Sequence, residues 1–156
     1  MVNTGTAFHI YFPALARSAA LTASAPLDEV KGGSETVLVV EDEESVRELM
    51  RSVLERFGYR VYCASSGIEA LEIWDRHRTA VNMLATDMIM PNGIGGRDLA
   101  ERLLHDNPHL KVLFCSGYTD DLLGADSQWH ARGNFLNKPF DLRDFLRKVR
   151  ECLDKP

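Results

Sequence analysis

The chain has 156 residues, of which 45% are hydrophobic, and this composition is typical of one globular domain of ordinary size with an additional segment. The formal net charge is −5, and all of it falls in residues 34–156, because the charged residues before them cancel. The sequence contains no basic cluster of the kind that binds nucleic acid, no apolar run of about 20 residues that would cross a membrane, and no secretory signal, so we expect a cytoplasmic segment that contacts neither nucleic acid nor a membrane.

The N-terminal part of the chain lacks the pattern of a domain. A short strand-like run at residues 7–12 is stopped by a proline, and one strand has no core of its own. The residues that follow are rich in Ala, Ser and Thr and end in two glycines, a composition typical of a linker. We therefore expect residues 1–13 to be a separate segment, residues 14–34 to be a linker and residues 35–156 to form the globular domain.

From residue 36 onward, two apolar patterns alternate along the chain. Short continuous apolar runs predict strands that are buried on both faces of a sheet, and apolar residues at helical spacing predict amphipathic helices. Strands are expected at residues 37–40, 59–64, 81–86, 110–115 and 135–136. Helices are expected at residues 46–57, 68–74, 99–104, 121–130, where the pattern is poor, and 142–149.

Strands that alternate with helices in this way predict an α/β fold with a parallel sheet and helices on both of its faces. Right-handed crossovers and one reversal of winding give a doubly wound, five-stranded sheet of the flavodoxin-like type, with strand order 2-1-3-4-5. A ligand in such a fold binds beyond the carboxyl ends of the strands. The residues that follow each strand are therefore the candidates for chemistry.

Polar residues follow four of the five predicted strands. They are Glu41 and Asp42 after the first, Asp87 after the third, Ser116 after the fourth and Lys138 after the fifth. Each residue has a structural explanation on its own: the acidic pair can favour a helix dipole, Asp87 can cap a helix, Ser116 can form a turn and Lys138 can lie in a solvated loop. Acids, a hydroxyl and a lysine gathered at one edge of a sheet favour a functional site instead.

These residue types suit phosphoryl transfer. Mg²⁺ prefers carboxylate oxygens together with phosphate, and Glu41, Asp42 and Asp87 can supply the carboxylates. A carboxylate can accept a phosphoryl group as an aspartyl-phosphate, and Asp87 follows the central strand. Lys138 and Ser116 can donate hydrogen bonds to phosphate oxygens. The sequence therefore predicts Mg²⁺-dependent phosphorylation of Asp87, at a site where crowded acids raise one another's pKa.

Four stretches at these positions resemble the response-regulator receiver family: VLVVEDEESVRELM, ATDMIMP, LFCSGYTDD and FLNKPF. The resemblance covers about residues 35–153. It implies that Asp87 accepts a phosphoryl group from a phosphohistidine, that Ser116 and Lys138 contact the phosphate, and that the domain catalyses its own phosphorylation and dephosphorylation.

The resemblance also implies a metal site and a conformational switch. The Mg²⁺ ligands would be Glu41, Asp42, Asp87 and the backbone carbonyl of Ile89. Glu41 departs from the family pattern, in which Asp is the commoner residue. The switch would use Ser116 and the aromatic residue Phe135, which lacks the hydroxyl of the frequent Tyr and so cannot form that hydrogen bond.

The subtype resembles receivers that are attached to hybrid sensor histidine kinases, on the stretches MPNGIGG, SGYTDD and FLNKPF. Residues 4–13, TGTAFHIYFP, are similar to the final strand of a histidine-kinase ATPase domain. This implies that residues 1–13 are the end of such a domain, that the parent protein is a histidine kinase, which can be membrane-anchored, and that the partner is a histidine kinase or a histidine phosphotransfer protein. Whether the domain forms a homodimer is left open.

Three other functions are compatible with parts of this pattern. A stand-alone single-domain regulator shares the chemistry and differs only in its context. A receiver that docks proteins without being phosphorylated is disfavoured by the complete set of acids, hydroxyl and lysine. A flavin-binding protein of the same topology would need a phosphate-cradling loop after the first strand, where this chain has the acidic sequence EDEES.

Overall fold

The computed structural model describes residues 8–9, 30–90, 93–117 and 134–155. The described elements are β1 (Thr36–Val40), α1 (Glu44–Arg56), β2 (Arg60–Ala64), α2 (Gly67–His77), β3 (Met83–Asp87), α3 (Gly96–Asp106), β4 (Lys111–Ser116), β5 (Phe135–Asn137) and α5 (Leu142–Asp154). The helix expected at residues 121–130 lies outside the described residues. Of the strand expected at residues 7–12, only Phe8 and His9 are described, and both are exposed and outside any strand.

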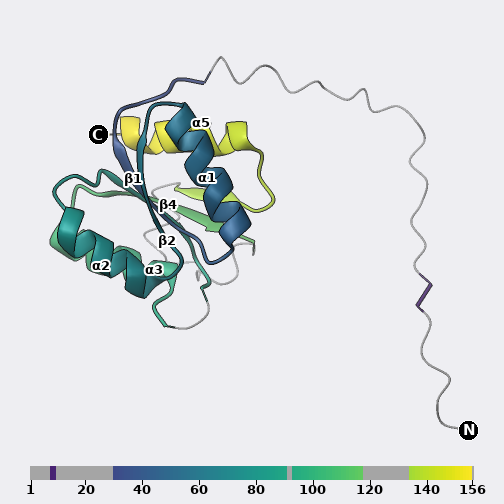
Figure 1. Ribbon diagram of the computed structural model, residues 1–156, viewed down its shortest axis with the longest axis horizontal. Coiled ribbons are helices and arrows are strands. Elements are labelled where there is room, and N and C mark those ends of the chain that lie inside the picture. Colours follow the sequence, from purple (N-terminus) through teal and green to yellow (C-terminus); the bar gives the residue numbers. More distant parts are fainter. Residues whose placement is uncertain (1–7, 10–29, 91–92, 118–133, 156) are drawn as a thin grey trace, which may run out of the picture.

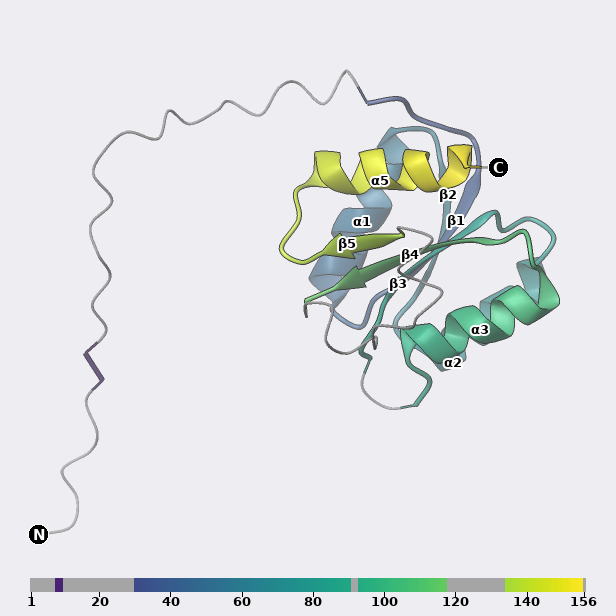
Figure 2. The ribbon, with the colours of Figure 1, turned by 180° about the vertical axis from the view of Figure 1, so that it is seen from behind.

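The strands form one parallel sheet in the order β2-β1-β3-β4-β5, which confirms the predicted doubly wound, flavodoxin-like fold. Helices α1 and α5 cover one face of the sheet, and α2 and α3 cover the other (Figure 1). The view from behind shows the same two layers (Figure 2). No described helix is both long enough and apolar enough to cross a membrane.

Two apolar cores lie on opposite faces of the sheet, because successive residues of a strand point to opposite sides. In β1, Val37 and Val39 pack into the core under α1 and α5, whereas Leu38 and Val40 pack into the core under α2 and α3. All five residues of β1 are buried. Burial of one such side chain contributes about 2 kcal/mol, so the two cores hold the strand ends in fixed places.

Local signals fix where the helices begin and end. The hydroxyl of Ser66 accepts a hydrogen bond from the Glu69 backbone N–H, and the Glu69 carboxylate accepts one from the Ser65 N–H, so both groups cap the start of α2. The Asp141 carboxylate caps α5 in the same manner. Helix α1 ends before Gly58, whose φ of 93° lies in the left-handed region that favours glycine.

The residues that enter the domain, 30–34, lie against its body. The Gly33 N–H donates to the Phe57 carbonyl at the end of α1, at 3.1 Å. The Arg150 guanidinium of α5 donates to the Glu35 carboxylate at 2.8 Å, and Val30 packs against the core under α1 and α5. The described end of the expected linker is thus fixed along α5.

Candidate functional site

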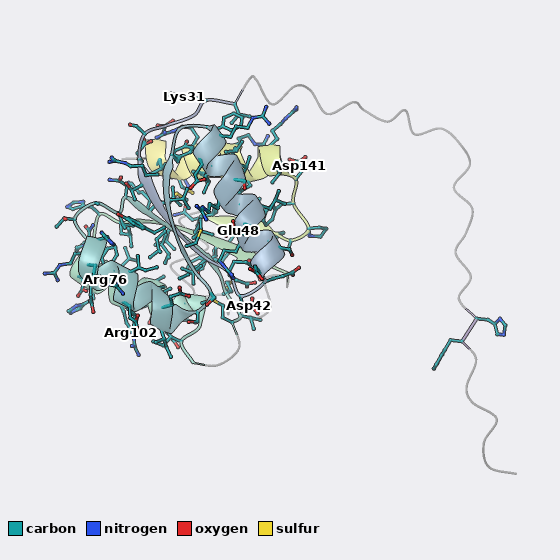
Figure 3. All side chains as sticks on the ribbon, viewed as in Figure 1. Lys31, Asp42, Glu48, Arg76, Arg102 and Asp141 are labelled. Atoms are coloured by element: carbon teal, nitrogen blue, oxygen red, sulfur yellow. The ribbon has the colours of Figure 1, made fainter. Side chains whose placement is uncertain are left out.

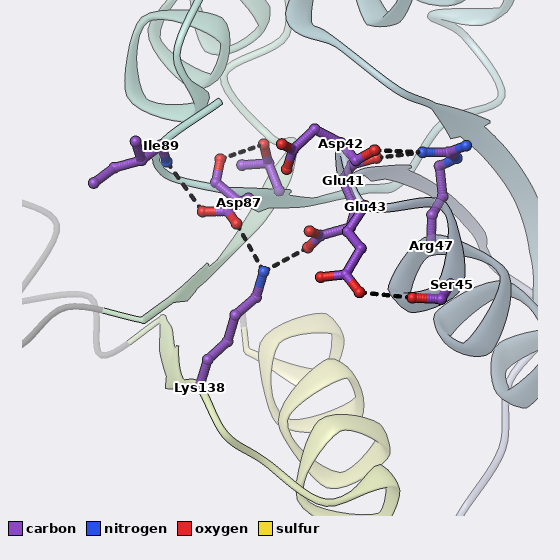
Figure 4. A network of polar contacts seen from close by, with 9 residues as sticks. Glu41, Asp42, Glu43, Ser45, Arg47, Asp87, Ile89 and Lys138 are labelled. Atoms are coloured by element: carbon purple, nitrogen blue, oxygen red, sulfur yellow. Dashed lines mark hydrogen bonds and ion pairs between the residues drawn. The ribbon is translucent and has the colours of Figure 1, made fainter. Parts of the chain in front are cut away.

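The site lies at the carboxyl edge of the sheet, where four strand ends meet. Strand β1 ends just before Glu41 and Asp42, β3 ends at Asp87, β4 ends at Ser116 and β5 ends just before Lys138. These four strands are neighbours in the sheet, so their ends come together. Figure 3 shows where Asp42 lies on the whole domain, and Figure 4 shows the site from close by.

Lys138 bridges two of the acids. Its ammonium Nζ lies 2.7 Å from Asp87 Oδ2 and 2.7 Å from Glu41 Oε2 (Figure 4). The side chain of Glu41 is only 2% exposed, that of Asp87 is 15% exposed and that of Lys138 is 24% exposed. A carboxylate buried to this degree is stable in its charged form only with a close partner, and Lys138 is that partner.

The ionisation of the site is set first by burial. Burial raises the pKa of Glu41, the hydrogen bond and charge of Lys138 oppose this rise, and the charges of Asp87 and Asp42 add to it to a smaller extent. Burial lowers the pKa of Lys138, but its hydrogen bonds to Asp87 and Glu41 outweigh this, so the pKa of the lysine is raised overall. The crowding of acids expected from the sequence is present, but it is secondary to burial.

The acidic cluster has the geometry of a cation site. One carboxylate oxygen from each of Glu41, Asp42 and Asp87 lies within 4.8 Å of the others. The ammonium of Lys138 already occupies a position between two of these carboxylates, which shows that the cluster accommodates a positive charge. Hard oxygen donors at this spacing suit Mg²⁺, which binds through one or two carboxylates and completes its octahedron with water and phosphate. The residues present therefore fit such an ion.

The backbone around Asp87 holds its carboxylate in place. The Ile89 N–H donates to Asp87 Oδ1 at 3.0 Å, and the Thr86 hydroxyl donates to the Asp87 carbonyl at 2.9 Å. Gly96, at the start of α3, lies so close that a Cβ there would overlap the Asp87 carbonyl oxygen. Sequence reasoning missed the role of Gly96, for which the only signal is its place in the motif GIGG.

Ser116 lies next to this centre, and Phe135 lies on the same sheet, three residues before Lys138. Asp87 pairs in register with Cys115, so Ser116 lies one residue beyond Asp87 on the adjacent strand. Ser116 is buried, and its carbonyl accepts a hydrogen bond from the Lys138 N–H at 2.6 Å. The ring of Phe135 stacks on that of Phe114 with centroids 5.3 Å apart, on the side of the sheet covered by α2 and α3. Of the two expected switch residues, Ser116 therefore lies at the edge of the site, whereas Phe135 pairs with Phe114, two residues before Ser116 along β4.

One further residue reaches the site. Arg47, in the first turns of α1, donates from Nη1 to the Glu41 carbonyl at 2.7 Å and to the Asp42 carbonyl at 3.3 Å. Sequence reasoning missed Arg47, because its partners are backbone atoms, which leave no signature in the sequence beyond a basic residue that follows several acids.

Known proteins that are similar in sequence include receiver proteins and a sensor kinase. A family model described as a response regulator receiver domain matches residues 37–150. Sensor kinase CckA of Brucella abortus is 36% identical over 162 residues, which cover 99% of this chain but only 17% of that protein. Response regulator receiver protein CpdR of the same organism is 32% identical over 117 residues, which cover 75% of this chain and 95% of that protein.

Solved structures share the fold. The receiver domain of hybrid histidine kinase CckA matches with a TM-score of 0.64 and 32% identity, over 76% of this chain and 99% of that chain. The response regulator TrrA of Thermotoga maritima, crystallised in complex with Mg²⁺-BeF, matches with a TM-score of 0.65 and 27% identity, over 76% of this chain and 99% of that chain. This chain belongs to the response regulator receiver domain family of two-component signalling.

Proposed function

We propose that Asp87 accepts a phosphoryl group from a phosphohistidine of a partner protein. The observation that carries this proposal is the position of Asp87 at the end of the central strand, with the Lys138 ammonium 2.7 Å from its carboxylate and two further acids beside it. Receiver domains interact with histidine kinases or histidine phosphotransfer proteins, so the partner of this domain belongs to one of those classes.

The reaction needs a nucleophile, groups that stabilise the negative charge of the phosphoryl oxygens, and a leaving group that accepts the electron pair of the broken bond. An oxygen of the Asp87 carboxylate attacks the phosphorus, a P–O bond forms, and the P–N bond breaks with its electron pair going to the imidazole nitrogen. Lys138, held between Asp87 and Glu41 before the reaction, then donates to a phosphoryl oxygen. The Ser116 hydroxyl, one residue beyond Asp87 on the adjacent strand, donates to another phosphoryl oxygen.

Glu41, Asp42 and Asp87, with the Ile89 carbonyl, would hold Mg²⁺ in this proposal. When bound, the ion neutralises negative charge on the transferring group, which is the main requirement of phosphoryl transfer. Support comes from the spacing of the three carboxylates and from TrrA, a relative of similar fold whose structure was solved in complex with Mg²⁺-BeF. The side chain of Glu41 is longer than that of the Asp found more often at this position, and its carboxylate accepts a hydrogen bond from Lys138. Its backbone begins the loop between β1 and α1.

We further propose that phosphorylation moves Ser116 and Phe135. A phosphoryl group on Asp87 would draw the Ser116 hydroxyl toward it and vacate space into which the Phe135 ring can rotate. The ring is stacked on Phe114 and is half-buried, so its rotation would change the surface at β5 and the adjoining segments.

The preferred context is the C-terminal receiver of a hybrid histidine kinase. The alignment with sensor kinase CckA spans 99% of this chain and so extends upstream of the receiver domain, which supports the proposal that residues 1–13 belong to the end of a kinase ATPase domain and residues 14–34 to a linker. A stand-alone regulator is the second candidate, because CpdR matches the domain over 95% of its own length. The sequence of the full gene upstream of residue 1 distinguishes the two.

The phosphorylation proposal is tested with a small phosphodonor such as acetyl phosphate in the presence of Mg²⁺. We expect one acid-labile phosphate per chain by intact-protein mass spectrometry, and Asp87→Asn should lose it completely. Asp75→Asn is the matched control, because Asp75 is an exposed residue of α2 outside the site, and it should be labelled like the wild type. Equal labelling of Asp87→Asn and wild type would contradict the assignment.

A further inference from the structure

The loop that joins β1 to α1 carries an unusual concentration of charge. Its residues and the first residue of α1 form a run of four acids, Glu41 to Glu44. The first two of these acids belong to the proposed metal site. The Asp42 side chain is exposed, and no hydrogen bond holds its carboxylate among the described residues. The position of that carboxylate is therefore set by the backbone of the loop. The β1 end of this backbone is held by the hydrogen bond from the Glu41 N–H to the Ala64 carbonyl, at 3.1 Å.

Arg47 holds the backbone of the loop from the first turns of α1. Its Nη1 donates to the carbonyl of Glu41 at 2.7 Å and to the carbonyl of Asp42 at 3.3 Å (Figure 4). The guanidinium thus bridges the backbone oxygens of the two acids whose side chains point to the proposed cation site. Arg47 is half-buried, as expected for a side chain that folds back onto the chain rather than into water.

Arg47 lies near the amino end of α1, which is an unfavourable place for a cation unless contacts such as those with the two carbonyls compensate. The amino end of a helix carries a partial positive charge that favours acids and disfavours bases. Helix α1 has no side-chain cap, since Glu43 at its start makes no capping hydrogen bond. Arg51, one turn further along α1, makes ordinary surface pairs with Glu48 and Glu55 instead and does not reach the loop.

We propose that Arg47 is a positioning residue that holds the Glu41–Asp42 backbone so that the two carboxylates are preorganised for a divalent cation. This inference rests on the proposed metal role of Glu41, Asp42 and Asp87. Groups that orient metal ligands typically change metal affinity by 10–100-fold when they are removed. The removal of a positive charge alone would act in the opposite direction, because it lowers the repulsion of an incoming cation. The two explanations therefore predict opposite signs.

The test compares Mg²⁺ binding by the full chain as wild type, Arg47→Met, Arg51→Met and Asp87→Asn, by isothermal titration with MgCl₂ at constant ionic strength. Arg47→Met should bind Mg²⁺ about tenfold more weakly than wild type. Arg51→Met removes the same charge one turn away and should bind as wild type or slightly more tightly. Equal or tighter binding by Arg47→Met would overturn the positioning role.

Amide hydrogen exchange of the metal-free proteins is the second readout. Exchange at residues 42–46 should be faster in Arg47→Met than in wild type and unchanged in Arg51→Met, because Arg47 hydrogen-bonds the backbone of the loop and Arg51 pairs with Glu48 and Glu55 instead. Unchanged exchange in Arg47→Met would also overturn the inference.

If neither wild type nor Asp87→Asn binds Mg²⁺, the proposed metal site fails, and the exchange data still decide whether Arg47 holds the loop. If Arg47→Met does not fold, as judged by its thermal melt, Arg47→Lys takes its place. The Mg²⁺ affinity of Arg47→Lys should lie between that of wild type and a value tenfold weaker.

Discussion

At the scale of residues, the ion pair between Arg150 and Glu35, away from the site, gives a pH-dependent prediction. The hydrogen bond from Arg150 lowers the pKa of Glu35, and burial opposes this to a smaller extent. A carboxyl whose pKa is lower in the folded state contributes stability above its unfolded pKa, about 4.3, and loses it as the pH falls through the folded value. Glu35→Gln should therefore lower the free energy of unfolding by about 1 kcal/mol at pH 7.

Urea denaturation of wild type and Glu35→Gln from pH 7 to pH 3 measures this difference. It should be constant at neutral pH and shrink below about pH 4.3 as Glu35 becomes protonated. Glu72→Gln is the control, because Glu72 pairs with Arg76 on an exposed face of α2 at 3.6 Å. A difference for Glu35→Gln that grows toward low pH would contradict the sign of the pKa shift.

At the site, residue positions after the predicted strands indicated which side chains gather, but not how they pair. Parallel strands end at one edge of a sheet, so Glu41, Asp87 and Lys138 could be placed together. The sequence did not show that Lys138 lies between the two acids, or that Arg47 binds backbone carbonyls. Such pairings depend on rotamers and loop paths, which residue spacing does not determine.

At the scale of elements, the apolar periodicity of the sequence predicted which described segments form strands and helices, but not all of the residues at which they begin and end. Strands and helices with strong apolar periodicity were predicted within one or two residues in the cases of β1, at 36–40, and α1, at 44–56, whereas α5 extends five residues beyond its expected end at residue 149. The boundaries shifted where a cap or a turn decides them: α2 begins at Gly67 because Ser66 caps it, and β2 begins at Arg60 because buried Tyr59 still belongs to the turn after Gly58. Periodicity does not contain this information.

The close approach of α3 to β3 is an element-scale feature that can be tested. A Cβ at Gly96 would overlap the Asp87 carbonyl, so Gly96→Ala must displace either the start of α3 or Asp87. We expect Gly96→Ala to lose about 2 kcal/mol of stability and to be phosphorylated more slowly than wild type.

Gly95→Ala is the matched control for this substitution. A Cβ at Gly95 would meet the Met88 carbonyl at 3.4 Å, which is ordinary contact, and its φ of −70° suits alanine. Gly95→Ala should lose only the preference of the helix N-cap for glycine over alanine, about 0.7 kcal/mol. The measurements are urea denaturation and the rate of labelling by acetyl phosphate. Equal rates for the two variants would show that contact with α3 does not position Asp87.

At the scale of the whole molecule, the sheet connects Asp87, the proposed phosphorylation site, to β5 and α5. Asp87 ends the central strand, and Phe135 lies two strands away on β5, which leads directly into Lys138 and α5. If phosphorylation moves Ser116 and Phe135, the change should pass along β4 and β5 toward α5, and the outer face of α2 should stay unchanged. The sequence predicted the residues of this route through the family resemblance, not through composition or spacing.

Amide chemical shifts with and without beryllium fluoride and Mg²⁺ test this route. We expect shifts in β5, in residues 121–130 and in α5 of wild type, and none beyond the immediate site in Asp87→Asn. Phe135→Leu should bind the phosphate mimic but show smaller shifts in α5, because the smaller side chain changes the packing against Phe114. Wild-type shifts confined to the residues around Asp87 would rule out a long-range switch.

The division of the interior into two cores has a consequence for how the protein tolerates change. Distant substitutions that share no partners usually add in their effects on stability, and those in contact do not. Trp74 and Leu103 lie in one core, and Leu54 and Leu146 lie in the other, with the sheet between them. Variants from the two layers should therefore combine additively. The layer of α2 and α3 can then be redesigned as a separate module while α1, with Arg47 and the acidic loop, keeps its packing.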